Sequence, residues 1–343
     1  MIKEVIQMSK RIIFPRAGVA ELQEYEAPVP KSGEVLVRLM VSTISSGTER
    51  ANLSGEINIS IRDQSPVAIF PRAGGYSSAG IVEAVGEGVR KFHPGDRVAL
   101  SWSTHSEFCC LPEKFVHTLD DELTFEQGAL LHISIFPLAA IRKCRVEIGE
   151  SAIVMGQGIL GLIALPLLKA AGAVPVIAAD PIPEKREKAL ACGADYALDP
   201  FAPDFSEKVK ELTGGGVKTA IEVTGNGKAL DTVLDCMARF GRVALLGCTR
   251  HSDFTIDYYH KVHGPGITMI GAHTDARPEN DSSSGWWTQP DDVKVVMQLI
   301  RFGRYDPAKM IDETHSPSEA PEVYAKLLNE PSFPMVQFDW RKL

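Results

Sequence analysis

The sequence lacks several features that mark common classes of protein. Its 343 residues contain no lysine run and no basic tail, and its 44 acidic and 36 basic side chains are interspersed, with a formal net charge of −8. This balance argues against a nucleic-acid partner. No segment reaches the about 20 consecutive apolar residues that a membrane-spanning helix needs. The amino terminus mixes charges into its apolar residues, unlike a signal peptide, so we expect a cytoplasmic protein with no membrane partner.

Closely spaced cysteine pairs are also missing. None of the six cysteines takes part in a C-x-x-C pair, the spacing that many metal and redox sites use. Cys109 and Cys110 are adjacent in an expected strand, where neighbouring side chains point to opposite faces. We therefore interpret all six as free thiols.

The length suits two domains, and the residue pattern changes near Leu131. Before it, short apolar segments alternate with turns that contain proline and glycine, which predicts a β-rich, barrel-like domain. The expected strands cover residues 20–25, 34–42, 80–85, 97–100 and 107–111.

Beyond residue 125 the pattern becomes an alternation of helices and strands. A stretch with helical spacing at 125–144 precedes expected strands at 152–155, 174–179, 219–223, 242–246 and 267–270, with intervening stretches such as 183–192 and 228–240. This alternation predicts a parallel, doubly wound sheet and an α/β fold class. Two further helices, at 291–302 and 318–328, follow a polar loop and continue neither sheet in an obvious way.

The most specific motif is the glycine-rich turn that follows the expected strand 152–155 and opens a helix. In such a motif the first glycine permits a tight turn, the second lets the backbone approach a pyrophosphate, and the third lets the helix pack closely on the strand. We expect a dinucleotide to contact Gly156, Gly158, Ile159, Leu160 and Gly161.

Asp180 ends the next expected strand, where a carboxylate binds the adenosine ribose hydroxyls and repels a 2′-phosphate. The residues after it are Pro-Ile-Pro rather than an arginine, so we predict NAD rather than NADP. Lys185 would also reach this ribose, although an exposed helix lysine is the simpler interpretation. Thr224, Gly247 and Gly271 lie at strand carboxyl ends, where doubly wound sheets bind their ligands.

The order of these parts resembles that of the medium-chain dehydrogenase/reductase superfamily of the zinc-type alcohol dehydrogenase kind. The matching segments, 28–37, 80–89, 94–98, 156–161 and 191–195, read PVPKSGEVLV, GIVEAVGEGV, PGDRV, GQGILG and ACGAD. The resemblance implies a GroES-like β-barrel catalytic domain over 1–137, completed by 272–343, and a Rossmann doubly wound parallel sheet over 138–271. It further implies hydride transfer between a nicotinamide and a small alcohol or ketone, in a homodimer or homotetramer.

The departures from the family pattern concern zinc. Where zinc-dependent members have a cysteine and a histidine, this sequence has Ser46 and Tyr76, and the third ligand place reads His132. Catalytic zinc needs three strong ligands, and neutral hydroxyls are poor substitutes. The cysteine-rich lobe that binds structural zinc is missing as well, so the resemblance implies a zinc-free member. The string Ser-Gly-Thr-Glu-Arg at 46–50, followed by Gly75-Tyr76, is similar to bacteriochlorophyllide dehydrogenases and sugar-pathway oxidoreductases.

Without zinc, side chains must move the hydroxyl proton as the hydride leaves carbon. Tyr76 would hydrogen-bond or protonate the substrate oxygen, although an ordinary phenol titrates at about 10. His132 carries an imidazole, which suits proton transfer at neutral pH. Thr48 would relay a proton to bulk water. Each has a structural alternative: a packed barrel aromatic, a core histidine at the domain junction and a helix-capping residue.

Two other segments attract attention. His260 and His263 lie three residues apart near Asp257, but this spacing is not diagnostic of a metal site, and a solvated or subunit-facing segment is the better interpretation. Trp286 and Trp287 stand in a polar loop, where they would stack on a ring-shaped substrate or be buried at a subunit contact.

The sequence thus predicts a zinc-independent, NAD-dependent oxidoreductase that acts on a polyol, sugar-derived or cyclic secondary alcohol or ketone. One alternative is an enone or quinone reductase that uses NAD(P)H, against which Asp180 argues. The other is a catalytically inactive NAD-binding protein with a regulatory or scaffold role.

Overall fold

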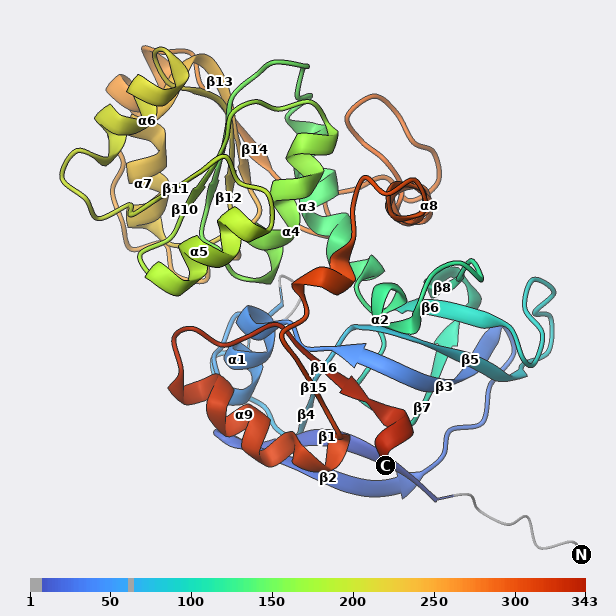
Figure 1. Cartoon of the computed structure of the whole chain (residues 1–343). Helices are drawn as coiled ribbons and strands as arrows, with labels where there is room; N and C mark the ends of the chain where they lie inside the picture. Colours follow the sequence, from blue (N-terminus) through green and yellow to red (C-terminus); the bar gives the residue numbers. More distant parts are fainter. Residues whose placement is uncertain (1–7, 61–64) are drawn as a thin grey trace, which may run out of the picture. The chain divides into compact units, whose positions relative to one another are not determined.

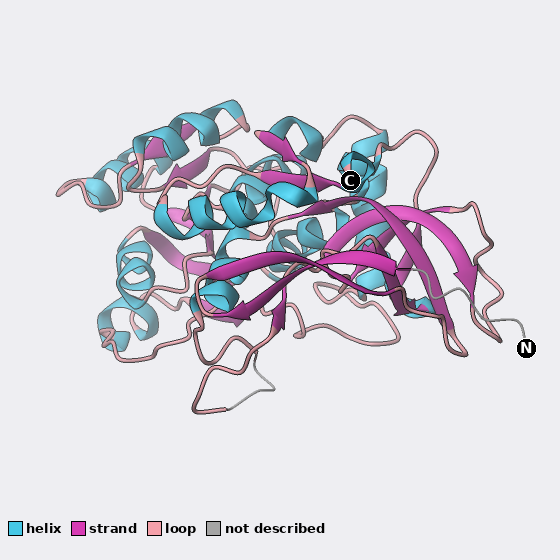
Figure 2. Ribbon diagram, turned by 90° about the horizontal axis from the view of Figure 1, so that it is seen from below, coloured by secondary structure: helices cyan, strands magenta, loops and turns pink. Residues whose placement is uncertain are grey.

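The structure is a computed structural model that describes residues 8–60 and 65–343, and it divides into two compact units. The first unit comprises residues 1–132 and 306–343, and the second comprises residues 133–305. Helices and strands both recur along the chain, which is therefore mixed α/β (Figure 2). No helix among the described residues has the length and apolar character needed to cross a membrane.

The first unit is built mainly of strands. These are β1 (Met8–Arg16), β2 (Val19–Glu26), β3 (Glu34–Thr43), β4 (Arg72–Ala73), β5 (Ser77–Val85), β6 (Arg97–Ser101), β7 (Phe108–Pro112), β8 (Val116–Thr118), β15 (Glu313–His315) and β16 (Val336–Asp339). The helices of this unit are α1 (Ser46–Ser54), α2 (Phe125–Gly128) and α9 (Ala320–Asn329). The strands expected before residue 112 are all present, which confirms the β-rich first part.

The carboxyl-terminal segment joins the sheet of the first unit. The strand order is β15-β16-β3-β5-β6-β8, with β7 also paired to β3, and a smaller sheet has the order β2-β1-β4. β16 is antiparallel to β3, so the red strands β15 and β16 of Figure 1 form one edge of this sheet, beside the blue β3. The rings of Phe14, Tyr324 and Phe338 meet in the core, with centroids 4.9 and 6.0 Å apart. Burial of these apolar side chains explains why the tail returns to this sheet.

The second unit contains the doubly wound sheet. Its strands are β9 (Ala152–Met155), β10 (Val176–Ala179), β11 (Tyr196–Leu198), β12 (Val217–Glu222), β13 (Met237–Leu245) and β14 (Thr268–Gly271). Its helices are α3 (Leu131–Lys143), whose first two residues belong to the first unit, α4 (Ile159–Ala170), α5 (Pro183–Ala191), α6 (Phe205–Thr213), α7 (Gly227–Asp235) and α8 (Gln289–Arg301). All neighbouring strands are parallel, in the order β11-β10-β9-β12-β13-β14. This is the Rossmann order that the alternating pattern predicts.

The segment 228–240 was expected to form a helix between two strands, and this expectation is wrong for residues 237–240, which belong to strand β13. Helix α7 begins after Asn226, whose side chain accepts hydrogen bonds from two backbone N–H groups, and it ends at Asp235. The next strand already begins at Met237, which pairs with Val217 of β12. Strand pairing therefore overrides the apolar helical spacing here.

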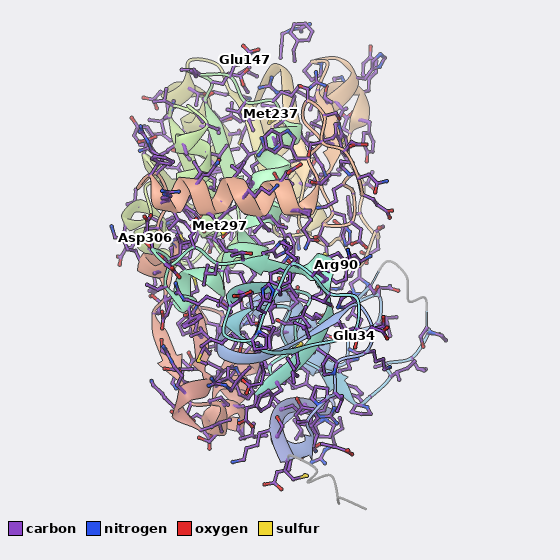
Figure 3. All side chains as sticks on the ribbon, turned by 90° about the vertical axis from the view of Figure 1, so that its right-hand side faces the viewer. Glu34, Arg90, Glu147, Met237, Met297 and Asp306 are labelled. Atoms are coloured by element: carbon purple, nitrogen blue, oxygen red, sulfur yellow. The ribbon has the colours of Figure 1, made fainter. Side chains whose placement is uncertain are left out.

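Residues 272–305, which the family resemblance assigns to the first domain, group instead with the parallel sheet. The buried carboxylate of Asp292 on α8 lies 3.1 Å from the Arg142 guanidinium on α3 and 3.5 Å from that of Arg277. The ring of Trp287 lies 3.7 Å from the Arg142 guanidinium carbon. These contacts hold α8, on which Met297 is labelled in Figure 3, to the second unit.

Substitution Asp292→Ala should lower the free energy of unfolding by about 3–5 kcal/mol, because it leaves two guanidinium groups without their buried partner. Urea unfolding followed by tryptophan fluorescence measures the change. Lys294→Ala is the control, since Lys294 makes an exposed ion pair on the same helix and its loss should cost less than about 1 kcal/mol. Equal effects of the two variants would contradict this account.

Candidate active site

The hydroxyl of Tyr76 is held by a buried serine. Tyr76 lies between β4 and β5, and its hydroxyl donates to Ser45 Oγ at 2.5 Å. Ser45 is 3% exposed and precedes α1, but its side chain makes no capping bond within the described residues. The Ser45 hydroxyl therefore serves Tyr76 rather than the helix. The backbone N–H of Trp102 donates to the Tyr76 carbonyl oxygen at 2.8 Å and fixes the main chain.

Three aromatic rings meet around this hydrogen bond. The His132 ring packs edge-on against Tyr76 and Trp102, with centroid distances of 5.7 and 4.7 Å. His132 is 2% exposed, whereas Trp102 is 37% exposed and has a φ of 64°, which is rare for a bulky residue. The structure thus brings two predicted catalytic residues together and adds Trp102, which the sequence interpretation missed. Its position directly after β6 is the signal that could have identified it.

The start of α3 is anchored to the barrel, which sets the position of His132. The carbonyl oxygen of Ala129 accepts the Thr43 hydroxyl at 2.9 Å and the Ser77 hydroxyl at 2.7 Å. A side chain at Gly128 would lie 2.9 Å from Ala79, so the backbone here packs directly on β5. Side chains of β3 and β5 both donate to the Ala129 carbonyl oxygen, which lies three residues before His132. These two bonds therefore fix the start of α3, and with it His132, relative to the sheet.

Thr48 lies in the first turn of α1 and is half-buried. Its carbonyl oxygen accepts the Asn52 side-chain amide at 2.9 Å. The N-cap position of α1 is occupied by Ser45. Thr48 therefore does not cap this helix. A role for Thr48 in relaying a proton stays a prediction.

The donors at the expected zinc positions are two hydroxyls and one imidazole. Ser46 is the first residue of α1, and the Tyr76 hydroxyl already donates to Ser45. Across residues 8–60 and 65–343, no group of three His, Cys, Asp or Glu side chains has an arrangement that could hold a metal ion. This donor set does not fit catalytic zinc, which requires three strong ligands.

The glycine-rich turn joins β9 to α4 in the second unit. Helix α4 begins after Gly158 without a side-chain cap among the described residues, so its first N–H groups face the space before the helix. A Cβ atom at Gly161 would lie 1.9 Å from the Gly156 carbonyl oxygen, whereas one at Gly158 would meet nothing within 4 Å. Ile159 and Leu160 form the first turn of α4. The third glycine is therefore required for packing, while the second leaves room for a ligand.

Asp180 is fixed directly after β10 by backbone groups. It is 4% exposed, and its two oxygens accept the N–H groups of Gln157 at 2.7 Å and Ile182 at 3.0 Å. A carboxylate has about four lone-pair sites, so each oxygen retains one for a further donor. Arg186, which the sequence interpretation missed, donates to the carbonyl oxygens of Asp180 and Pro181 at 2.8 and 2.9 Å.

The other predicted cofactor residues lie at strand ends or beside them. Thr224 follows β12, Gly247 follows β13, Gly271 ends β14, and Lys185 is half-buried on α5. A Cβ atom at Gly156 would lie 2.7 Å from Thr224 Cγ2, so the glycine turn and the β12 loop are neighbours.

A buried carboxylate shapes the β12 loop. Glu222 accepts the N–H groups of Thr224 at 2.7 Å and Gly225 at 3.1 Å. Burial raises the pKa of Glu222, although these hydrogen bonds oppose the shift. Sequence reasoning missed Glu222, because it reads as the polar end of an apolar strand.

The two other unusual segments make local contacts. His260 pairs with Asp257 at 2.7 Å, and both are exposed. The ring of Trp286 lies 4.8 Å from Lys143 Nζ, and burial lowers the pKa of Lys143 to about 8. Trp286 and Trp287 thus cover two cations on α3. All six cysteines are free thiols, as predicted.

Comparison with known proteins matches both units. Family models for the alcohol dehydrogenase GroES-like domain and for zinc-binding dehydrogenase match residues 31–132 and 160–281. (R,R)-butanediol dehydrogenase of Bacillus subtilis is 32% identical over 232 residues, which cover 60% of this chain and 67% of the relative. L-threonine 3-dehydrogenase of Pyrococcus horikoshii is 29% identical over 284 residues, covering 74% and 79%. An Escherichia coli alcohol dehydrogenase complexed with NADH has a TM-score of 0.81 at 19% identity, covering 97% and 99%.

Two glycine substitutions should separate ligand binding from folding. Gly158→Ala should leave the melting temperature within about 2 °C, because the added methyl meets open space, but should weaken NAD binding at least about tenfold by blocking the pyrophosphate. Gly161→Ala should lower the melting temperature as well, since its methyl would collide with the Gly156 carbonyl. Calorimetry and NAD titration measure both effects. A Gly158→Ala variant that binds NAD normally would contradict the assignment.

Proposed function

Because the chain belongs to the zinc-type medium-chain dehydrogenase/reductase superfamily, we propose that it is a zinc-independent, NAD-dependent oxidoreductase. Its substrate is a polyol, sugar-derived or cyclic secondary alcohol, or the corresponding ketone. The observation that carries this proposal is the Tyr76 hydroxyl, held by Ser45 beside His132 and Trp102.

The second unit has the features that NAD requires. The uncapped start of α4 offers N–H groups and the positive end of the helix dipole to a pyrophosphate. Asp180 retains acceptor positions for two ribose hydroxyls, and its negative charge opposes the 2′-phosphate of NADP. The Arg186 guanidinium donates to two carbonyl oxygens and lies 3.7 Å from the Asp199 carboxylate, which balances part of the positive charge of Arg186. When bound, NAD supplies the acceptor for the hydride.

In this proposal, side chains of the first unit transfer the proton of the substrate hydroxyl. During ketone reduction the phenol of Tyr76 donates its proton to the carbonyl oxygen, and in alcohol oxidation the Tyr76 phenolate takes the proton of the substrate hydroxyl. The Ser45 hydroxyl holds the phenol in both states, because it accepts from a phenol and can donate to a phenolate. His132 packs edge-on against Tyr76 and is the second candidate group for the proton transfer. Thr48 passes the proton on to solvent.

The donors present at the expected zinc positions support zinc independence. In zinc members the metal polarises the substrate oxygen, whereas here a hydrogen bond from the Tyr76 phenol polarises the ketone oxygen during reduction. The exposed ring of Trp102 favours a substrate with a C–H face, such as a polyol or a ring-shaped alcohol. We further propose a homodimer or homotetramer, in line with the family. Asp180 disfavours the alternative enone or quinone reductase, which would use NADPH.

The cofactor preference is tested by Asp180→Ala. The variant should bind NAD at least about tenfold more weakly, equivalent to about 1.4 kcal/mol, and should lose affinity for NADP much less, since the charge that repels the 2′-phosphate is gone. Fluorescence titration with both nucleotides measures the ratio. Glu184→Ala, on the exposed surface of α5, is the control. An unchanged ratio in Asp180→Ala would overturn the preference for NAD.

The metal prediction is tested on protein purified without a chelator. Elemental analysis should find far less than one zinc per chain, and reduction of NAD by butane-2,3-diol, sorbitol or cyclohexanol should persist after treatment with a chelator. Absorbance at 340 nm follows the reaction. Stoichiometric zinc would refute the proposed mechanism, and NAD binding without turnover on such a panel would favour the inactive scaffold protein.

A further inference from the structure

The carboxylate of Glu49 is the centre of a buried hydrogen-bond network that the steps above do not use. Glu49 lies on α1 and is 1% exposed. Its Oε1 accepts the backbone N–H of Ser45 at 2.8 Å. Its Oε2 accepts the hydroxyl of Tyr324 and lies 3.0 Å from Nε2 of His105, which is itself fully buried.

The network extends to the far end of the chain. Nδ1 of His105 lies 2.7 Å from Ser42 Oγ, which also accepts the indole N–H of Trp340 at 2.9 Å. The groups around Glu49 therefore come from β3, α1, the loop before β7, α9 and the carboxyl-terminal turn. Burial and the neighbouring carboxylate raise the pKa of Tyr324 well above its ordinary value, so Tyr324 remains a hydrogen-bond donor.

Ser45 connects this network to the proposed chemistry. Its backbone N–H is bound by Glu49, while its side-chain oxygen accepts the Tyr76 hydroxyl at 2.5 Å. A shift of the Ser45 main chain would carry its Oγ with it, because Cβ and Oγ follow the backbone. Near a reacting group, a displacement of 1 Å can cost two orders of magnitude in rate.

We propose that Glu49 is a positioning residue for the reaction: by holding the Ser45 backbone, it fixes the Ser45 hydroxyl that orients the phenol of Tyr76. This inference rests on the proposed function, in which Tyr76 exchanges the substrate proton. A carboxylate suits the position because the Ser45 N–H and the Tyr324 hydroxyl both donate to it, and an amide would turn an N–H group toward one of its neighbours.

The first test reads the orientation of Tyr76 without any substrate. The seven tyrosines are replaced by 3-fluorotyrosine, and the ¹⁹F resonance of Tyr76 is identified by its loss in Tyr76→Phe. In Glu49→Gln and in Ser45→Ala this resonance should shift or broaden, because the phenol loses its fixed partner. Ser78→Ala is the matched control, since Ser78 is a buried serine on β5 whose hydroxyl donates to Ser103 at 2.7 Å.

The second test uses NAD with the alcohol of the above panel that is oxidised fastest. Glu49→Gln and Ser45→Ala should each lower kcat about tenfold, equivalent to about 1.4 kcal/mol, with KM changed less than about twofold. In a Tyr76→Phe background neither substitution should reduce kcat further, because both act through the missing hydroxyl. Ser78→Ala should leave kcat unchanged. If Glu49→Gln does not fold, Ser45→Ala carries both tests.

The outcomes separate this inference from the function on which it rests. If Tyr76→Phe lowers kcat but Ser45→Ala moves neither kcat nor the ¹⁹F resonance, the positioning role is refuted and the proposed function stands. Losses that multiply in the Tyr76→Phe background would also refute it, since they would indicate a general structural effect. If Tyr76→Phe itself retains full kcat, the proposed function fails, and the positioning role fails with it.

Discussion

A carboxylate that is buried away from water needs hydrogen-bond donors from the protein for its oxygens. In the first unit, Glu49 is such a buried carboxylate. Its two oxygens engage Ser45, His105 and Tyr324, which are far apart in the sequence. These contacts join the loop before α1, the loop before β7 and helix α9 at one buried carboxylate. The proposed proton-transfer group, Tyr76, is connected to Glu49 by two hydrogen bonds, both of which involve Ser45.

The second unit uses buried acids in the same way, but for the loops at the carboxyl ends of its parallel strands. Asp180 binds the N–H groups of Gln157 and Ile182, and Glu222 binds those of Thr224 and Gly225. In both cases a carboxylate at a strand end orders the turn that follows. The carboxyl ends of the parallel strands lie at the same edge of the sheet, and the two acids fix the backbone of the loops there through hydrogen bonds. Such preorganised loops lose less entropy when a dinucleotide binds.

The sequence predicted much of the fold, and the reason differs between the two units. Residues 152–155 were assigned as a strand with the observed bounds, because they form a short apolar run directly before a glycine turn. The parallel, doubly wound sheet followed from the alternation of helices and strands. The partner of the carboxyl-terminal strand was not predictable, since β16 pairs with β3 across almost 300 residues, Gln337 lying opposite Thr43. No local pattern specifies such a pairing.

What the sequence determined by itself is local: the glycine-rich turn that joins β9 to α4 and the acid at Asp180 directly after β10. These depend on residue type and spacing along one strand–turn–helix unit or on one motif. Only the tertiary structure decided that the Tyr76 hydroxyl donates to Ser45 and that the Ser45 N–H donates to Glu49. It also decided that the rings of Trp102 and His132 pack against Tyr76. Those contacts join several distant segments, and only burial in a common core brings such segments together.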